Sequence, residues 1–313
     1  KSTIYRSPPF LLIIFNRPDP TKQVFQAIKE ARPERLYVAA DGPRADRAGE
    51  AGKCDEVRRI ATEVDWDCEV RTLFREENLG CKAAVSSALD WLFENEEYGI
   101  ILEDDCLPSQ DFFTYCGELL DRYVDDERVW TIAGTNNQNG IKRGDASYFF
   151  SQYVLVWGWA TWKRAWALND LQMSFWDTWK KSESWHRIWD NDSDRIFWES
   201  RFDEAAGNRI DTWDYAWIAS VWNGGGLTAV PNYNLISNIG FGVDATHTMD
   251  KDSHKANIPL TRIDELSHPP DVVINREADR YAATHFFSSP KWSLIVRFVR
   301  LAKRIIRRIV TLR

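Results

Sequence analysis

The chain has 313 residues, of which 44% are apolar and 13% aromatic, so it can bury a large core and disorder is excluded as its default state. The formal charge is −7, yet residues 291–313 carry eight Lys or Arg and no acid. Taking those eight charges away leaves −15 for the preceding 290 residues. Because phosphate backbones bind to positive surfaces, an acidic body predicts no nucleic-acid partner.

The five cysteines have no Cys-x-x-Cys spacing, which excludes the usual patterns of a disulfide framework or a structural zinc site. A reducing compartment is therefore expected. No apolar run reaches the roughly 20 residues that cross a bilayer, and the first residues lack a signal-peptide pattern. Together these features predict a cytoplasmic protein.

The first hundred residues alternate short β-type runs with helical patterns. The β-type runs are Phe10–Phe15, Arg35–Ala40, Glu69–Phe74 and Tyr98–Leu102, and the helical patterns between them are Thr21–Ala31, Asp55–Val64 and Gly80–Phe93. This rhythm predicts βαβ units. It therefore favours an α/β protein with a Rossmann-like, mainly parallel central sheet flanked by helices.

Polar residues or glycine follow each of the predicted strands. Ligands of such sheets gather at the carboxyl ends of the strands, so these are the positions to inspect. We expect one cleft lined by four loops, which are Asn16-Arg17, Asp41-Gly42, Asn78-Leu79-Gly80 and Glu103-Asp104-Asp105.

The apolar run at residues 100–102 ends abruptly in three acids, Glu103, Asp104 and Asp105. Adjacent carboxylates repel one another, so placing them in a cleft favours a bound cation. Mg²⁺ and Mn²⁺ take carboxylate and phosphate oxygens, and this is how a diphosphate leaving group is commonly held. The alternative is a solvated acidic turn, but the strand before the acids favours a Mn²⁺ or Mg²⁺ site.

Twelve of the sixteen tryptophans fall between Trp157 and Trp222, with no repeat period. Most are expected to form a core of bulky residues. An indole face can also stack on the apolar face of a pyranose while its N–H donates a hydrogen bond. Trp159 and Trp213, which neighbour glycine or acids, are therefore the expected acceptor-binding residues.

Residues 291–313 predict a basic amphipathic helix. At the helical step, apolar residues and basic residues fall on opposite sides; they are Leu294, Phe298, Leu301, Ile305 and Ile309 against Arg297, Arg300, Arg304 and Arg307. Such a helix is suited to the interface of an anionic membrane. The alternative is a helix docked on the body or on a second chain.

Several segments match a known family in order and spacing. They are Phe15-Asn16-Arg17, Val38–Gly42, Leu102–Asp105, Asp111–Tyr115, Thr131–Gly140, Gly158–Trp166, Trp213–Tyr215 and Ser237–Gly242. On them the sequence resembles the eukaryotic N-acetylglucosaminyltransferase I family and its bacterial relatives, which have the GT-A fold. The resemblance implies a GT-A domain over residues 1–290, with a nucleotide-binding half at about 8–135 and an acceptor and catalytic half at 136–250, before the helix at 291–313.

The resemblance also implies roles for single residues. The nucleotide-sugar site would consist of Asn16, Arg17, Asp41, Glu103 and Asp104. Within it, Asp41 would accept a hydrogen bond from the base, expected to be uracil, and Asp104 would reach the ribose. Asp105 would ligate the metal that bridges the two phosphates.

Trp213-Asp214 resembles the tryptophan and acid pair that supplies the family's catalytic base. Inverting transfer requires one carboxylate that deprotonates the acceptor hydroxyl as it attacks the anomeric carbon. Asp211 is the runner-up for this role, and either acid could instead cap the helix predicted at Tyr215–Val221. The family has a second acid where this chain has Tyr215.

The polar, glycine-containing stretch at residues 232–247 predicts a mobile loop. In the resembling enzymes this region closes over the donor and excludes water. His247 is then a candidate metal ligand, since imidazole accepts Mn²⁺ more readily than Mg²⁺. A structural or surface histidine is the alternative.

These observations predict a metal-dependent, inverting glycosyltransferase. It would move a sugar, with GlcNAc as a candidate, from a UDP-sugar to a glycan or lipid-linked acceptor at the inner face of a bacterial plasma membrane. The first alternative is a sugar-phosphate nucleotidyltransferase, although the glycine-rich first loop of that class is missing from residues 15–18. The second is a non-catalytic glycan-binding or scaffold protein on the same fold.

Overall fold

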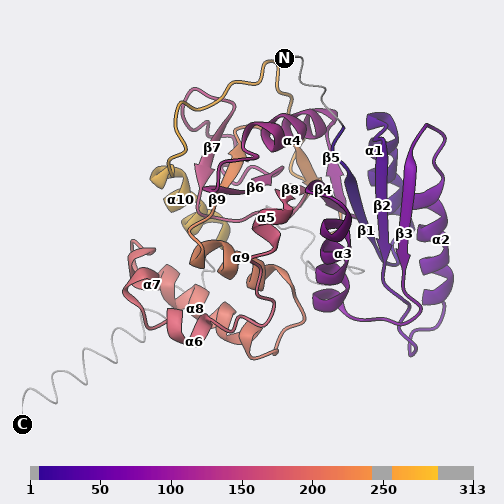
Figure 1. Cartoon of the computed structure of the whole chain (residues 1–313), viewed down its shortest axis with the longest axis horizontal. Helices are drawn as coiled ribbons and strands as arrows, with labels where there is room; N and C mark the ends of the chain where they lie inside the picture. Colours follow the sequence, from indigo (N-terminus) through magenta and orange to yellow (C-terminus); the bar gives the residue numbers. More distant parts are fainter. Residues whose placement is uncertain (1–6, 242–255, 288–313) are drawn as a thin grey trace, which may run out of the picture.

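A computed structural model describes residues 7–241 and 256–287, which contain a central eight-stranded sheet (Figure 1). Its strands are β1 (Phe10–Ile14), β2 (Arg35–Ala40), β3 (Glu69–Phe74), β4 (Tyr98–Glu103), β6 (Val129–Ala133), β7 (Tyr148–Ser151), β8 (Trp159–Trp162) and β9 (Leu227–Pro231). Their order in the sheet is β3-β2-β1-β4-β8-β6-β9-β7. His247 and the tail at 291–313 lie outside the described residues. The metal-ligand role expected of His247 and the amphipathic helix expected at 291–313 therefore stay predictions.

The sheet is mixed but mainly parallel. Strands β3, β2, β1 and β4 pair in parallel, as expected for successive βα units. Strand β8 is antiparallel to both β4 and β6, and β6 is parallel to β9. Since β7 is antiparallel to β9, only β8 and β7 run against the common direction in this sheet. The predicted α/β class with a mainly parallel sheet is therefore confirmed.

Helices cover both faces of this sheet. They are α1 (Pro18–Ala31), α2 (Glu50–Thr62), α3 (Cys81–Asn95), α4 (Gln110–Arg122), α5 (Lys163–Trp166), α6 (Trp176–Trp179), α7 (Glu183–Arg187), α8 (Asp192–Ala206), α9 (Asp214–Asn223) and α10 (Arg276–Ala282), which continues into a π-helical turn at Ala283–Phe287. In Figure 1, α6, α7 and α8 lie at the opposite end of the molecule from α1 and α2.

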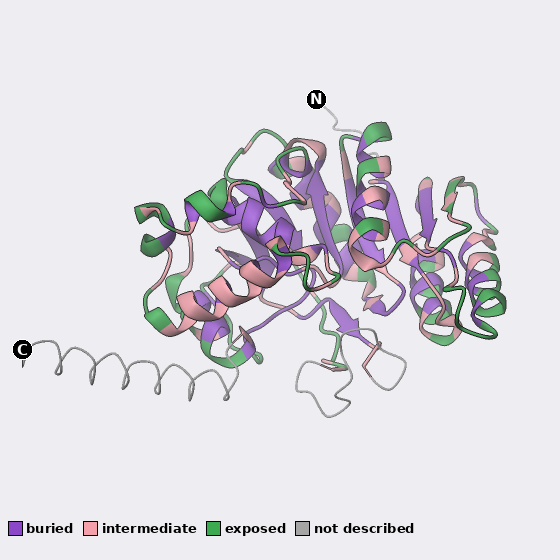
Figure 2. Ribbon diagram, turned by 90° about the horizontal axis from the view of Figure 1, so that it is seen from below, coloured by how far each residue is buried: buried purple, intermediate pink, exposed green. Residues whose placement is uncertain are grey.

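The sheet separates two cores, because successive side chains of a strand point to opposite faces. Phe10, Leu12 and Ile14 of β1 pack with residues of α1, α2 and α4. Leu11 and Ile13 face the other side, where α3 and the tryptophan-rich helices α5 to α9 lie. In Figure 2 most strands are buried, and the exposed residues are on the outward sides of the helices and on the loops. The edge strand β3 is the exception, because its residues are exposed or half-buried.

The second core contains most of the clustered tryptophans. Trp176, Trp185, Trp198 and Trp217 are among the largest fully buried side chains. Several of them meet edge to face; the Trp176 and Trp185 rings, for example, lie 4.9 Å apart at 86°. This is a favourable geometry for aromatic pairs. The prediction that most of these tryptophans build a core is confirmed.

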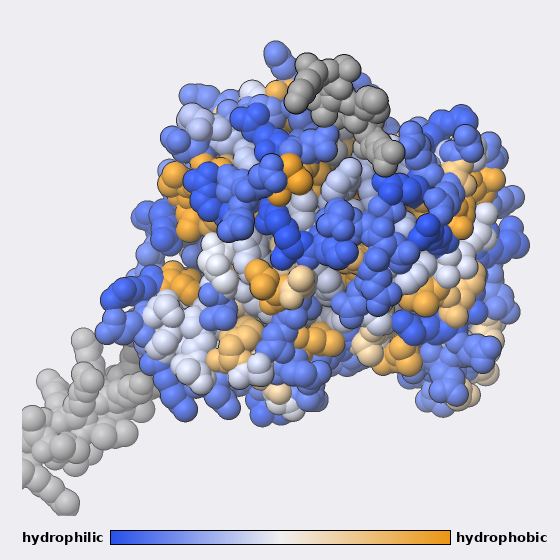
Figure 3. All heavy atoms as spheres, in the orientation of Figure 1, coloured by the Kyte–Doolittle hydropathy of each residue, from blue (hydrophilic) through white to orange (hydrophobic). Residues whose placement is uncertain are grey.

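The surface carries no large continuous apolar face in the view of Figure 3. Hydrophobic residues there form small patches separated by hydrophilic ones. Among residues 7–241 and 256–287, none of the helices combines the length and the apolar character needed to cross a membrane.

Candidate functional site

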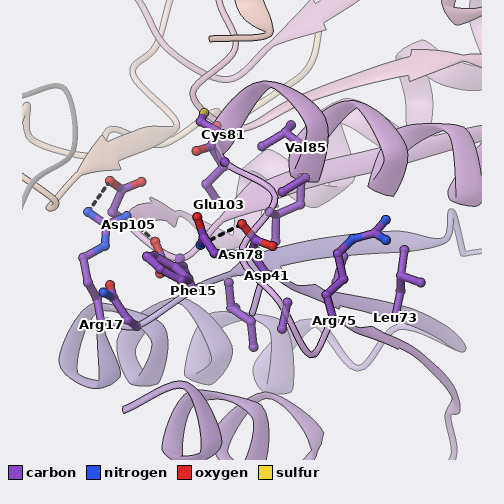
Figure 4. Close-up of a pocket in the computed structure, with 18 of the residues that line it drawn as sticks. Phe15, Arg17, Asp41, Leu73, Arg75, Asn78, Cys81, Val85, Glu103 and Asp105 are labelled. Atoms are coloured by element: carbon purple, nitrogen blue, oxygen red, sulfur yellow. Dashed lines mark hydrogen bonds and ion pairs between the residues drawn. The ribbon is translucent and has the colours of Figure 1, made fainter. Parts of the chain in front are cut away.

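A cavity of about 340 Å³ opens at the carboxyl ends of β1, β2 and β4 (Figure 4). This volume is in the range of small-molecule sites. The structure brings all four expected loops to it, since its lining includes Asn16, Arg17, Asp41, Asn78, Gly80, Glu103, Asp104 and Asp105. The topology explains this, because parallel neighbouring strands end at the same edge of the sheet.

A two-stranded ribbon fixes the acidic end of β4. After Glu103 the chain enters β5 (Cys106–Pro108), which pairs antiparallel with β10 (Ile236–Asn238). The Ile239 N–H donates to the Asp105 carbonyl over 2.9 Å. A Cβ atom on Gly240 would lie 2.0 Å from Asp105 Oδ2 and 2.7 Å from Arg17 Nη1. Only glycine allows the backbone this close to the acids.

Arg17 is the cation of the acidic cluster. Its guanidinium donates to Asp104 Oδ1, and its Nη1 lies 3.0 Å from Asp105 Oδ2 (Figure 4). Burial opposes the charge on Arg17, but Asp104 and Asp105 outweigh it and raise its pKa. Burial together with the charges of Asp105 and Asp104 also raises the pKa of Glu103. One guanidinium thus faces three carboxyl groups, so a further positive charge would be favourable in this cluster.

Asp104 lines the cavity, but little of it is free for a ligand. Its side chain is 4% exposed, and it accepts hydrogen bonds from Arg17 and from the Phe15 N–H. In this structure Asp104 orients Arg17, which also lines the cavity. The expected contact of Asp104 with ribose stays a prediction.

Asp41 joins the loops that follow β2 and β3. It accepts from the Gly42 N–H at 2.9 Å, the Leu79 N–H at 3.0 Å and Asn78 Nδ2 at 3.0 Å. The Leu79 N–H also reaches its second oxygen at 3.1 Å, so most of the acceptor capacity of this carboxylate is used. Burial raises the pKa of Asp41, and these backbone donors oppose the shift. Gly42 is required beside it, since a Cβ there would lie 2.4 Å from the Glu77 backbone.

Asn16 belongs to a second charged group beside the cavity. Its Nδ2 donates to Glu50 Oε1 at 2.8 Å, and Arg44 Nε donates to the same carboxylate at 3.1 Å. The hydrogen bonds from Arg44 lower the pKa of Glu50 to about 2. Asn238, from the segment Ser237–Gly242, lines the cavity as well. Sequence reasoning missed Arg44, Arg75, Cys81 and Trp157, which also line it. They come from loops and helix starts whose sequences carry no distinctive pattern.

Asp211 and Asp214 have different structural roles. Asp211 accepts from the Cys81 and Lys82 N–H groups at 2.8 and 2.9 Å, so it caps α3, a helix far away in sequence. Asp214 is the first residue of α9, and its Oδ1 accepts from the Tyr215 N–H at 2.9 Å and from the Thr212 hydroxyl. Its charge raises the pKa of Cys81, although burial is the larger cause.

Trp159 and Trp213 do not line the cleft. They are 1% and 3% exposed, and their rings stack on each other with centroids 5.7 Å apart. A sugar cannot stack on a ring that the core already covers, so their expected acceptor role is corrected. The indole at the cavity is Trp157, whose ring meets Phe241 edge-on at 5.8 Å.

Asp105 fits a metal that is shared with a ligand. The described residues contain no group of three or more His, Cys, Asp or Glu side chains placed to hold an ion by themselves. Mg²⁺ is usually bound by one or two carboxylates plus substrate phosphates, which does not require such a group. Asp105 and Glu103 both line the cavity. The donor set is thus one that a diphosphate would complete.

The chain matches no protein family model, and it matches no curated protein. Among solved structures, HddC from Yersinia pseudotuberculosis aligns at a TM-score of 0.30 and 9% identity, over 50% of this chain and 77% of that one. A UTP-bound UGPase from Acinetobacter baumannii aligns at 0.30 and 10%, over 51% and 77%. A UDP-glucose pyrophosphorylase complexed with UDP-glucose aligns at 0.29 and 9%, over 51% and 78%. At these scores the likeness carries no argument about function.

Proposed function

We propose that the protein is a metal-dependent glycosyltransferase of the GT-A kind that uses a UDP-sugar. One observation carries this proposal: Glu103 and Asp105 end a buried parallel strand and face a cavity of about 340 Å³ that Arg17 also lines. Carboxylates and a guanidinium at the strand ends suit a ligand with a diphosphate. The carboxylates can share a cation with the diphosphate, and the guanidinium can bind phosphate oxygens.

Arg17 is the phosphate-binding residue of the proposal. Its Nη1 is 3.0 Å from Asp105, and Asp104 holds the other side of its guanidinium. Asp105 would hold Mg²⁺ or Mn²⁺ together with the diphosphate, and such an ion would supply charge neutralisation to the leaving group. Asp41 holds residues 78 and 79 beside the cavity, where a base would enter.

Asp214 is the proposed catalytic base. The acceptor hydroxyl gives its proton to Asp214 while the oxygen forms a bond to the anomeric carbon. The bond from that carbon to the diphosphate oxygen breaks, and its electron pair leaves with UDP. The Tyr215 N–H and the Thr212 hydroxyl hold the carboxylate in one orientation during this step.

Titration calorimetry with UDP tests the proposed binding of the donor nucleotide. Wild-type protein should bind UDP with Mn²⁺ or Mg²⁺ and lose at least about tenfold in affinity with a chelator, because the ion is shared between Asp105 and the diphosphate. Asp105→Ala should bind weakly with or without metal. Asp67→Ala, which removes an exposed acid, is the matched control and should bind as the wild type does.

Full metal-independent binding of UDP by Asp105→Ala would overturn the proposal. A second assay supplies UTP and sugar 1-phosphates and measures pyrophosphate. Pyrophosphate release with no sugar transfer would assign the chain to the nucleotidyltransferases instead.

A further inference from the structure

A second cavity of about 400 Å³ lies beside the first. Trp157 lines both cavities, so the two adjoin at this residue. The second cavity is formed by the loops after β6 and before β8, by α8 and α9, and by the turn after α10. A ligand there would lie beside the contents of the first cavity.

Most of this second cavity is an aromatic and aliphatic wall. The wall is continuous, because Trp198 contacts Phe197 at 5.4 Å and Phe287 at 5.4 Å between ring centroids. Ile218 and Val154 extend it. Such a surface binds apolar groups by removing them from water.

One group of polar residues breaks the apolar lining. Asp214 and Tyr215 line the cavity at the start of α9, and the Tyr215 ring touches the wall at Trp198, 6.1 Å away. Thr135 and Asn137 are the other polar members. The proposed base is therefore next to an apolar surface.

We infer that the second cavity binds the acceptor, and that this acceptor is a neutral glycoside with an apolar aglycone. The inference rests on the proposed function, because the attacked sugar must sit in the first cavity. The hydroxyl of the acceptor would lie at Asp214 and the aglycone against Phe197, Trp198 and Ile218. A bare oligosaccharide would leave most of its hydroxyls against apolar carbon, which costs free energy.

The charge of the residues that line the second cavity favours an uncharged acceptor. None of the residues that line the second cavity in the described chain is Lys or Arg, and Asp214 is its acid. An acceptor with a phosphate or diphosphate would bring negative charge to the Asp214 carboxylate in a cavity whose described lining includes neither Lys nor Arg. The first cavity, by contrast, is lined by Arg17, Arg44 and Arg75.

Methyl and hexyl glycosides of glucose, galactose, mannose and N-acetylglucosamine test this inference. We expect the hexyl member of at least one pair to bind about tenfold or more tightly than its methyl partner, since each buried methylene adds to affinity. Affinities are measured by calorimetry and ligand-detected NMR. Phe197→Ala should reduce the preference at least about threefold. Phe175→Ala, an equally half-buried phenylalanine that packs on Trp179 outside the cavity, should keep it.

The same variants are titrated with UDP and metal to separate the two proposals. If UDP binds normally but no hexyl preference is seen, or Phe197→Ala leaves the preference intact, the acceptor inference is wrong and the donor site stands. Tighter binding of a hexyl phosphate than of hexyl glycosides would also overturn it. If UDP fails to bind under any metal condition, the proposed function fails and the acceptor role fails with it.

Discussion

Charged residues line the cavity in one half of the sheet, whereas aromatic residues fill the space in the other half. At the ends of β1, β2 and β4, acids and arginines such as Arg17 and Asp105 face a cavity and bind one another. Around β8, β6 and β9, tryptophans fill the space and the cavity is mainly apolar. Substitutions on the first side should therefore act through charge, and substitutions on the second side should act through packing.

Replacing a buried tryptophan should give the largest effect. Trp159→Ala should lower the free energy of unfolding by roughly 3–5 kcal/mol, because it leaves a large void in the second core. Trp157→Ala, on the cavity wall, should cost less than about 2 kcal/mol, since the residue is only partly buried. Urea unfolding followed by circular dichroism measures both. Equal costs would mean that both indoles belong to the core.

Asp214→Asn should affect chemistry rather than stability. Transfer should fall by about 10²-fold or more while UDP affinity stays within a few-fold, as expected when a general base is removed. Initial rates and calorimetry measure the two quantities. Asp211→Asn is the matched control and should keep transfer within a few-fold. If that variant loses transfer instead, the base is Asp211.

Two buried acids should give the two halves opposite pH responses. Burial raises the pKa of Asp279, which binds Ser151 in the second half, to about 6, whereas Arg44 lowers that of Glu50 to about 2. The folded protein thus holds a proton on Asp279 that the unfolded chain releases near pH 4. The contribution of Asp279 to the free energy of unfolding therefore falls by roughly 2 kcal/mol as the pH rises from about 4 to about 6. Glu50 stabilises above its unfolded pKa, and this contribution is lost as the pH falls towards 2.

The Asp279 contribution is measured as the difference between wild type and Asp279→Asn in urea unfolding from pH 4 to pH 7. The variant should lack the loss seen in the wild type. Parallel pH profiles for the two proteins would show that Asp279 is charged throughout.

Asp211→Ala should give the smallest effect. It removes the acceptor for two N–H groups at the start of α3, and caps of this kind contribute about 1 kcal/mol. Because this contact ties residue 211 to the first half of the sheet, the loss should appear as lower thermal stability. An unchanged melting temperature would show that water replaces the cap.

The parallel half could be predicted from sequence because its signals are local. Strands β1, β2 and β4 are short apolar runs. The acids Glu103 to Asp105 follow the apolar run of β4 directly, so the rule for ligands of parallel sheets alone brings them to the cavity. The cap from Asp211 to Cys81 could not be predicted, because its partners are 130 residues apart. Nor could the contact of Arg44 with Glu50, since such charges are usually solvated.

Trp157 and Trp159 show why the second half was harder to predict. They are only two residues apart, but Trp159 begins β8 and its register against Ile101 turns it into the core. Trp157 comes before Gly158, whose φ of 61° turns the chain out of the strand. Which indole meets the cavity is decided by the insertion of β8 between β4 and β6. No periodicity within residues 157–162 contains that information.

The position of β8 also has a consequence for folding on the ribosome. The chain makes β1, β2, β3 and β4 first, and these four strands can then pair in parallel with one another. The outer edge of β4 then stays unpaired until residue 162 has been made, because its partner there is β8. Unpaired edges promote association between chains. We therefore expect a nascent chain that stalls between residues 103 and 159 to expose a strand edge that β8 covers in the folded protein.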